Sequence, residues 1–170
     1  METQQHPPQT TPHPLELPAQ AVLEAIGKRS FATLASTSAE GWPHAAGVLY
    51  ALSGEHLYVS TLGSSRKARN IGANPRVAIT VPVRRSPFGP PSTIIFQTTA
   101  RVLELDDPEL RAAARTGDLD GVTGHGELEL PGGVFIQVAL PRKVVTYGLG
   151  MSLLSLMRDP MHASGFARLG

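Results

Sequence analysis

The strongest constraint on the fold is a series of short runs rich in aromatic, β-branched and aliphatic residues, joined by turn-forming residues. Three such runs cover residues 30–37, 44–52 and 56–61. The segments between them, Ala39-Glu40-Gly41 and Ser53-Gly54-Glu55, have the composition of tight turns. Because short glycine-containing connections join neighbouring antiparallel strands, these runs predict an antiparallel meander.

The rest of the chain adds more β-rich runs and few helical segments. We predict further strands over residues 76–83, 93–105, 134–139 and 143–147. Apolar spacing, caps and breakers predict helices over residues 18–27, 64–73, 107–116 and 151–157. These helices are too few for a doubly wound α/β sheet. Imperfect alternation in the runs suits a sheet wrapped into a barrel, so we predict a mainly β fold with peripheral α-helices.

The predicted order divides the chain into three parts. Residues 1–17 have almost nothing apolar to bury, so we expect a disordered N-terminal tail. Residues 18–150 form the expected barrel domain, and residues 151–170 the expected C-terminal helix and tail. Within that last part, residues 165–170 look like a loose end.

Composition excludes several classes of function. The 170 residues are 41% hydrophobic and 17% charged, as in a globular protein of about one domain. A net charge of +1 gives no global field for nucleic acid or an acidic membrane. The absence of cysteine excludes a disulfide framework and a thiol nucleophile, and the histidine spacings do not suit a metal. No apolar run approaches the roughly 20 residues of a membrane span, so we expect a cytoplasmic protein.

The segment from Ser60 to Asn70 (STLGSSRKARN) places hydroxyls, a glycine and three cations where a predicted strand turns into a predicted helix. Free N–H groups of a first helical turn, the helix dipole and cationic side chains can converge on a phosphate. Arg66 and Lys67 oppose that dipole unless an anion offsets them. A triphosphate loop motif is absent, so a monophosphate fits better. The alternative is a solvated basic turn in which Ser64 caps the helix.

Several segments resemble the pyridoxamine phosphate oxidase-like superfamily of flavin- and deazaflavin-binding split barrels. They are FATLAST (31–37), PHAAGVLYAL (43–52), LYVSTLGSSRKARNIGANPRVAITV (57–81) and FQTTARVLEL (96–105). The resemblance covers about residues 18–148. It implies a six-stranded antiparallel split β-barrel and a homodimer with FMN or the deazaflavin coenzyme F-420 between the subunits. The implied activity is an oxidoreductase that transfers hydride to or from a small organic substrate.

The resemblance also implies a set of cofactor-binding residues and leaves the catalytic residues unknown. Lys67 and Ser65 would hold the phosphate with help from Arg66, while Ser60 and Thr61 would border the ribityl chain. Small residues of the second strand would pass beside the ring, and the second subunit would lend two more. The whole set is Ala46, Gly47, Val48, Ser60, Thr61, Ser64, Ser65, Arg66, Lys67, Gln97 and Thr98.

Departures from the family pattern leave alternatives open. The C-terminal sequence LMRDPMHASGFARLG lacks the arginine-rich substrate motif of true pyridoxamine phosphate oxidases, which puts that activity in doubt. A carrier or sensor that binds flavin or haem without turnover is the alternative, with His162 where related proteins place a haem ligand. Residues 84–92 form either a wall of the substrate pocket or a variable surface loop. Arginines at 66, 69, 84 and 85 offer a basic path for the acidic tail of the deazaflavin, or are simply solvated.

Overall fold

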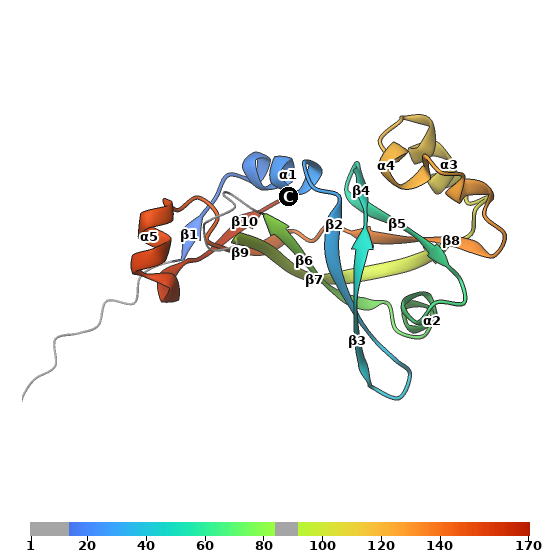
Figure 1. The fold of residues 1–170 in the computed structure, drawn as a ribbon, viewed down its shortest axis with the longest axis horizontal. Helices are drawn as coiled ribbons and strands as arrows, with labels where there is room; N and C mark the ends of the chain where they lie inside the picture. The colour runs from blue at the N-terminus through green and yellow to red at the C-terminus, as the bar shows by residue number, and fades with distance from the viewer. Residues whose placement is uncertain (1–13, 84–91) are drawn as a thin grey trace, which may run out of the picture.

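The computed structural model describes residues 14–83 and 92–170, and within them strands dominate. Ten strands form a curled sheet, with the helices at its periphery (Figure 1). The strands are β1 Leu15–Glu16, β2 Phe31–Thr37, β3 Pro43–Leu49, β4 Ala51–Ser53, β5 His56–Leu62, β6 Arg76–Val83, β7 Ser92–Leu103, β8 Gly133–Ala139, β9 Lys143–Tyr147 and β10 Ser164–Arg168. The helices are α1 Ala19–Gly27, α2 Arg66–Ala73, α3 Pro108–Arg115, α4 Asp120–Thr123 and α5 Leu153–Arg158, with 3-10 turns η1 Glu127–Glu129 and η2 Pro160–His162.

The long strand β7 joins the two parts of the sheet. Its first part pairs with β6 and β9, and residues Ala100 to Leu103 pair with β8. One path therefore runs β1-β10-β9-β7-β6-β2-β3, while β4, β5 and β8 form the other part. Every pair is antiparallel except β1 with β10. The mainly β split barrel predicted from the sequence is confirmed, with short strands added to the expected ones.

Strand β8 shows why alternation is imperfect in this chain. Ile136 and Val138 belong to the main barrel core, whereas Phe135 belongs to a second core beneath α3 and α4. Successive side chains of a strand point to opposite faces. Since both faces of β8 are covered by protein, apolar residues occupy both, and the strand shows no polar face.

The two ends of the described chain lie side by side, which corrects two predictions. Leu15 and Glu16, expected in the tail, pair with Gly165 and Phe166, expected in a loose end. Gly165 permits this close approach of the two strands, because a Cβ there would lie 2.7 Å from the Leu15 carbonyl oxygen. Residues 1–13 and 84–91, which include most of the proline-rich loop, lie outside the described residues.

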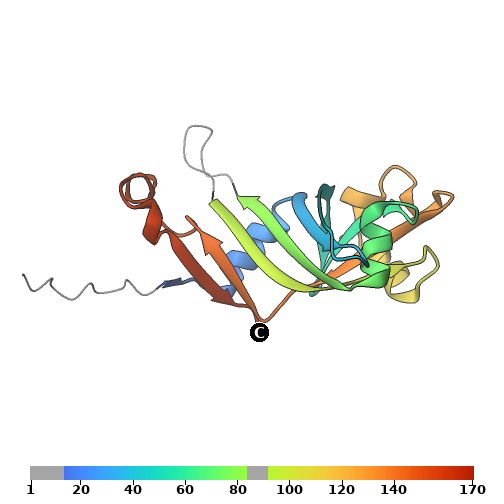
Figure 2. The same cartoon turned by 90° about the horizontal axis from the view of Figure 1, so that it is seen from below.

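The molecule is elongated, with different elements at its two ends. Helix α5 and strand β10 lie at one end, and α2, α3 and α4 lie at the other (Figures 1 and 2). The segment between β7 and β8, read from the sequence mostly as a loop after residue 116, contains α4 and η1. Among the described residues no helix is both long and apolar enough to cross a membrane.

Helix α1 is held to the barrel by its apolar face and by one buried hydroxyl. Val22 and Ile26, four residues apart, are fully buried in the main core. The Tyr50 hydroxyl donates a hydrogen bond of 2.7 Å to the Ile26 carbonyl oxygen. Burial raises the pKa of Tyr50, so the phenol stays neutral and remains a donor.

Replacing Tyr50 with Phe removes this hydrogen bond while keeping the ring. The Arg29 backbone N–H also donates to the Ile26 carbonyl, so that oxygen keeps one partner. We therefore expect Tyr50→Phe to lower the free energy of unfolding by about 0.5–1.5 kcal/mol, measured by urea denaturation. Tyr147→Phe is the control, because the Tyr147 hydroxyl makes no hydrogen bond within residues 14–83 and 92–170. An equal loss in both variants would contradict the role of Tyr50.

Candidate functional site

The turn between β5 and α2 is organised by Ser65. Its side-chain oxygen caps α2 by accepting a hydrogen bond of 3.3 Å from the Ala68 N–H, and the Thr61 hydroxyl lies 3.3 Å from the same oxygen. The alternative in which Ser64 is the cap is therefore wrong, because the Ser65 oxygen is the one within reach of the first helical turn. The Ser64 carbonyl instead accepts a hydrogen bond from the Arg69 guanidinium.

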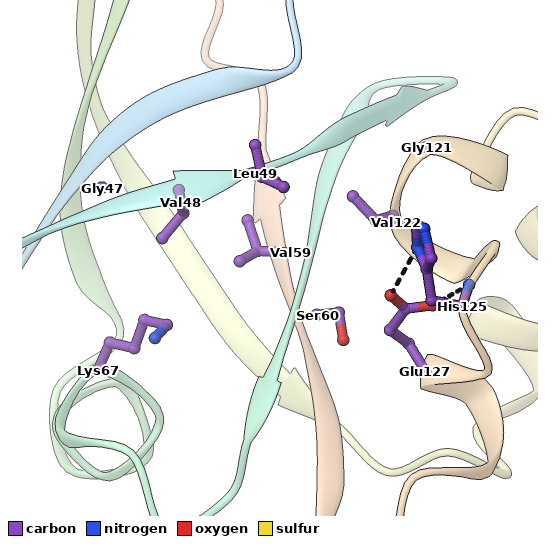
Figure 3. A pocket seen from close by; sticks show the side chains of 10 residues that line it. All are labelled: Gly47, Val48, Leu49, Val59, Ser60, Lys67, Gly121, Val122, His125 and Glu127. Carbon is purple, nitrogen blue, oxygen red and sulfur yellow. Dashed lines mark hydrogen bonds and ion pairs between the residues drawn. The ribbon is translucent and has the colours of Figure 1, made fainter.

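A cavity lies beside this turn, between strands β3 and β5 and the α4–η1 segment (Figure 3). Its volume is about 270 Å³. It is lined by Gly47, Val48, Leu49, Val59, Ser60, Lys67, Gly121, Val122, His125 and Glu127. The structure thus brings together four predicted site residues from three elements: Gly47, Val48, Ser60 and Lys67.

One side of the cavity offers hydrogen-bond donors without acceptors. The Lys67 side chain points toward the cavity, and its ammonium has no acidic partner among the described residues (Figure 3). Within the same part of the chain, the backbone N–H groups of Arg66 and Lys67 make no hydrogen bond. They belong to the first turn of α2, where the helix dipole is positive. This side therefore fits an anionic group.

The opposite side carries a carboxylate that the sequence analysis did not identify. The His125 backbone N–H donates a hydrogen bond of 2.9 Å to the Glu127 carboxylate, whose other oxygen lies 3.5 Å from the His125 ring. This backbone hydrogen bond, followed by that of the Glu127 N–H itself, lowers the pKa of Glu127, so the carboxylate is charged at neutral pH. Lys67 and Glu127 face the cavity from opposite sides, with Ser60 between them (Figure 3).

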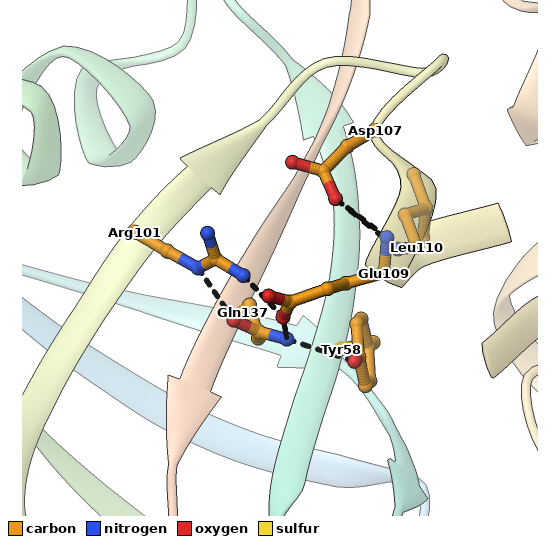
Figure 4. A network of polar contacts seen from close by, with 6 residues as sticks. All are labelled: Tyr58, Arg101, Asp107, Glu109, Leu110 and Gln137. Carbon is orange, nitrogen blue, oxygen red and sulfur yellow. Dashed lines mark hydrogen bonds and ion pairs between the residues drawn. The ribbon is translucent and has the colours of Figure 1, made fainter. Parts of the chain in front are cut away.

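A polar network fixes helix α3, which precedes the segment that carries His125 and Glu127 (Figure 4). The buried Gln137 side chain accepts a hydrogen bond of 2.7 Å from Arg101 and lies 2.8 Å from the Tyr58 hydroxyl. The Glu109 carboxylate of α3 pairs with Arg101 and lies 3.3 Å from Gln137. Asp107 caps the helix through the Glu109 N–H at 2.9 Å. Contacts from β5, β7 and β8 thereby set where the cavity wall begins.

A second cavity, of about 320 Å³, also lies along β3 and α2. It is lined by Ser38, Glu40, Trp42, Pro43, His44, Arg66, Arg69 and Asn70. Arg66, predicted to assist Lys67 on one phosphate, therefore lines a different cavity from Lys67. Successive residues of a helix are about 100° apart around its axis, so these two neighbours face different ways.

The remaining predicted residues lie elsewhere in the single chain. Gln97 and Thr98 border a hollow on the β2–β6–β7 face with Arg76, and the Thr98 hydroxyl donates a hydrogen bond of 2.9 Å to Ala139. Ala46 is on β3 but does not line the Lys67 cavity, and neither do Thr61, Ser64 and Ser65. The assignment of Gln97 and Thr98 to a second subunit stays a prediction.

Sequence reasoning missed the wall formed by residues 121–127 because that segment lacks a long periodic pattern. Its elements are a one-turn helix and a 3-10 turn, and the glycines at 121, 124 and 126 give this segment the composition of a loop. The available signal was the apolar pair Leu119 and Val122, both buried against the barrel. Apolar residues at helical spacing in a glycine-rich segment indicate packing.

The fold and the site together define a split-barrel protein with unpaired hydrogen-bond donors at a strand-to-helix turn. The family model described as pyridoxamine 5'-phosphate oxidase matches residues 18–138. The chain belongs to the pyridoxamine 5'-phosphate oxidase family. No curated protein sequence matches it.

Solved structures with the same fold include proteins described by different ligands. The heme storage protein HutZ from Vibrio cholerae has a TM-score of 0.61 at 21% identity, over 74% of this chain and 91% of HutZ. A heme binding protein from Mycobacterium smegmatis has a TM-score of 0.65 at 19% identity, over 78% of this chain and 55% of that one. A FAD-binding protein from Mesorhizobium loti has a TM-score of 0.60 at 22% identity, over 76% and 92%. At these identities the similarity defines the fold alone.

Proposed function

We propose that the chain binds FMN or the deazaflavin coenzyme F-420 and acts as an oxidoreductase on a small organic substrate. The observation that carries the proposal is the group of unpaired donors at the Lys67 side of the first cavity. The Lys67 ammonium and the unpaired Lys67 backbone N–H, at the positive end of a helix, are suited to a phosphate monoester. Membership of the family supports a flavin-type cofactor at this position.

The other cavity residues also fit a flavin-type cofactor. Gly47 lines the cavity without a side chain, and it is required there because a Cβ would lie 2.9 Å from the Phe31 ring. The Glu127 carboxylate cannot face a phosphate, but it can accept hydrogen bonds from ribityl hydroxyls or from an N–H at the edge of the ring. A phosphate toward Lys67 and neutral donors toward Glu127 would satisfy both sides.

The positions of these residues indicate what the cofactor and the chain would each contribute. When bound, the cofactor supplies hydride transfer, the chemistry that the side chains of this chain lack. Lys67 and the first turn of α2 hold the phosphate end, and Ser60 offers a hydroxyl along the middle of the cavity. Val48 and Val59 provide apolar surface, and Val122 adds to it from the facing wall.

We also propose that the site is completed by a second copy of this chain. The cavity of about 270 Å³ in one chain is smaller than the roughly 300–1,000 Å³ typical of ligand pockets. One face of the sheet carries four exposed apolar side chains, which are Phe31, Leu49, Ile95 and Val145. Phe31 lies opposite Leu49 on the neighbouring strand, and Ile95 lies opposite Val145. The register of β2 with β6 and of β6 with β7 places both pairs on the same face of the sheet. Such a face is suited to a homodimer interface.

A second candidate function, haem binding without turnover, is favoured by the geometry of His162. Its Nδ1 lies 2.7 and 2.8 Å from the two carboxylate oxygens of Asp159, which leaves Nε2 available to a metal. A carboxylate on the second ring nitrogen is typical of metal-ligating histidines. Leu154, Met157 and Met161 are exposed in the same segment and offer apolar contact to a porphyrin. The heme-binding structures that share the fold support this candidate.

The phosphate assignment predicts a loss of cofactor affinity in Lys67→Ala. Removing a charge-assisted contact should weaken FMN binding by about 1.5–3 kcal/mol, or about 10-fold to 150-fold. Titration of FMN fluorescence measures the dissociation constant, and the same titration with the deazaflavin compares the two cofactors. Lys28→Ala is the matched control, because Lys28 pairs with Glu24 on the exposed side of α1. Equal affinities in Lys67→Ala and wild type would contradict the site.

The dimer proposal predicts that a charge on the apolar face separates the subunits. Wild type should have a mass in solution of twice 18.0 kDa, measured by light scattering after size exclusion. Val145→Asp should give a single-chain mass, because an unpaired carboxylate in an apolar interface is strongly unfavourable. Leu130→Asp, at an exposed apolar residue after η1, should leave the mass unchanged. A wild-type protein with the mass of one chain would contradict the proposal.

The haem candidate predicts a specific dependence on His162. Added ferric haem should give a Soret band shifted from that of free haem, and His162→Ala should abolish the shift. His56→Ala is the control, since His56 lies on β5 and not in the α5–η2 segment. A shift that persists in His162→Ala would exclude His162 as the haem ligand.

A further inference from the structure

The second cavity has the side chains of a binding site in its own right. It lies on the same strand and helix as the first, with Pro43 and His44 of β3 lining it and Arg66 and Arg69 of α2 beside them. We propose that it binds the far part of an extended cofactor, a second phosphate followed by a planar base, so that the preferred ligand is a flavin dinucleotide. This inference rests on the proposed function, because the first phosphate must lie at Lys67.

The charge of the cavity suits a phosphate. No ion pair or hydrogen bond engages the Arg66 guanidinium within the described part of the chain. Arg69 donates to the Ser64 carbonyl through one nitrogen and keeps its other donors. Glu40, the acid among the lining residues, accepts a hydrogen bond of 2.8 Å from the Ser38 hydroxyl, and the two arginines outnumber its single negative charge. Two guanidinium groups with open donors form the geometry that binds phosphate oxygens in pairs.

The exposed indole of Trp42 suits a planar base. Trp42 is 75% exposed at the β2–β3 turn, and its side chain lines the cavity with the two arginines. A tryptophan is the largest apolar side chain and is seldom left in water without a contact to make. An indole face beside guanidinium groups can stack against an aromatic base. An acidic tail without a ring would use the arginines but gain little from Trp42.

His44 gives an independent sign that a polar contact is missing. Its Nδ1 is shielded from solvent and has no hydrogen-bond partner among the described residues. A shielded polar atom without a partner is unfavourable, and native structures rarely leave one. Because His44 lines the cavity, a ligand bound there is the group that we expect to supply the missing partner.

The two cavities are lined by neighbouring residues of the same two elements, which suits a single ligand. Lys67 and Arg66 are consecutive in the first turn of α2, and the cavities that they line share strand β3. A second phosphate bonded directly to the first would pass from the Lys67 side to the Arg66 side of the same helical turn. The base would then lie toward the β2–β3 turn, where Trp42 is.

The test compares FMN with FAD on four forms of the full chain. Fluorescence titration gives the FAD-to-FMN affinity ratio for wild type, Trp42→Ala, Arg69→Ala and the control Arg115→Ala, which removes an exposed arginine from the distant helix α3. We expect FAD to bind wild type and Arg115→Ala at least tenfold more tightly than FMN. In Trp42→Ala and Arg69→Ala this ratio should fall toward one. Thermal melts compare the folding of the four forms.

Two outcomes would overturn the inference, and they differ from failure of the proposed function. Equal affinity of wild type for FMN and FAD would overturn the inference while leaving the proposed function intact. A tighter binding of the deazaflavin that depends on Arg69 but not on Trp42 would identify an acidic tail as the occupant and overturn the dinucleotide. Absence of binding to FMN, to FAD and to the deazaflavin would overturn the inference and the proposed function together.

Discussion

The structure depends on the hydrogen bonding of β7 to different partners along its length. Up to Thr99 the strand pairs with β6, and from Ala100 it pairs with β8. At the change, the Ala100 N–H donates to the Pro75 carbonyl at 2.8 Å, just before β6 begins. The barrel is split because β7 belongs to both parts of the sheet. The connection that leaves the end of β7 becomes the α3–α4 wall of the first cavity, facing the helix that connects β5 to β6.

This arrangement places opposite charges on the two sides of the first cavity. The cationic side comes from a strand-to-helix turn, where unpaired N–H groups and Lys67 are brought together by local geometry. The anionic side comes from Glu127, whose carboxylate is held by the His125 N–H. Neither charge is paired with the other, and the ligand that fits has an acid at one end and donors at the other.

Much of the fold and part of the site were predictable from the sequence, and the remainder has clear physical reasons. The strands and α2 follow from local residue patterns, as does the position of Lys67 at a strand-to-helix turn. The pairing of β1 with β10 joins residues about 150 positions apart, which no local pattern reveals. The different directions of Arg66 and Lys67 follow from helical geometry and could have been inferred. The place of Glu127 in the cavity wall could not have been inferred, because the one-turn elements around it carry too little periodicity.

The attachment of the α3–α4 wall has a consequence for how such proteins diversify. The wall enters and leaves through adjacent antiparallel strands, and its anchoring network uses side chains of the barrel exterior. Residues between β7 and β8 can therefore lengthen, shorten or change sequence without disturbing the ladder that closes the barrel. The shape of the cavity can thus evolve independently of the scaffold, while the β5–α2 turn that carries Lys67 stays unchanged.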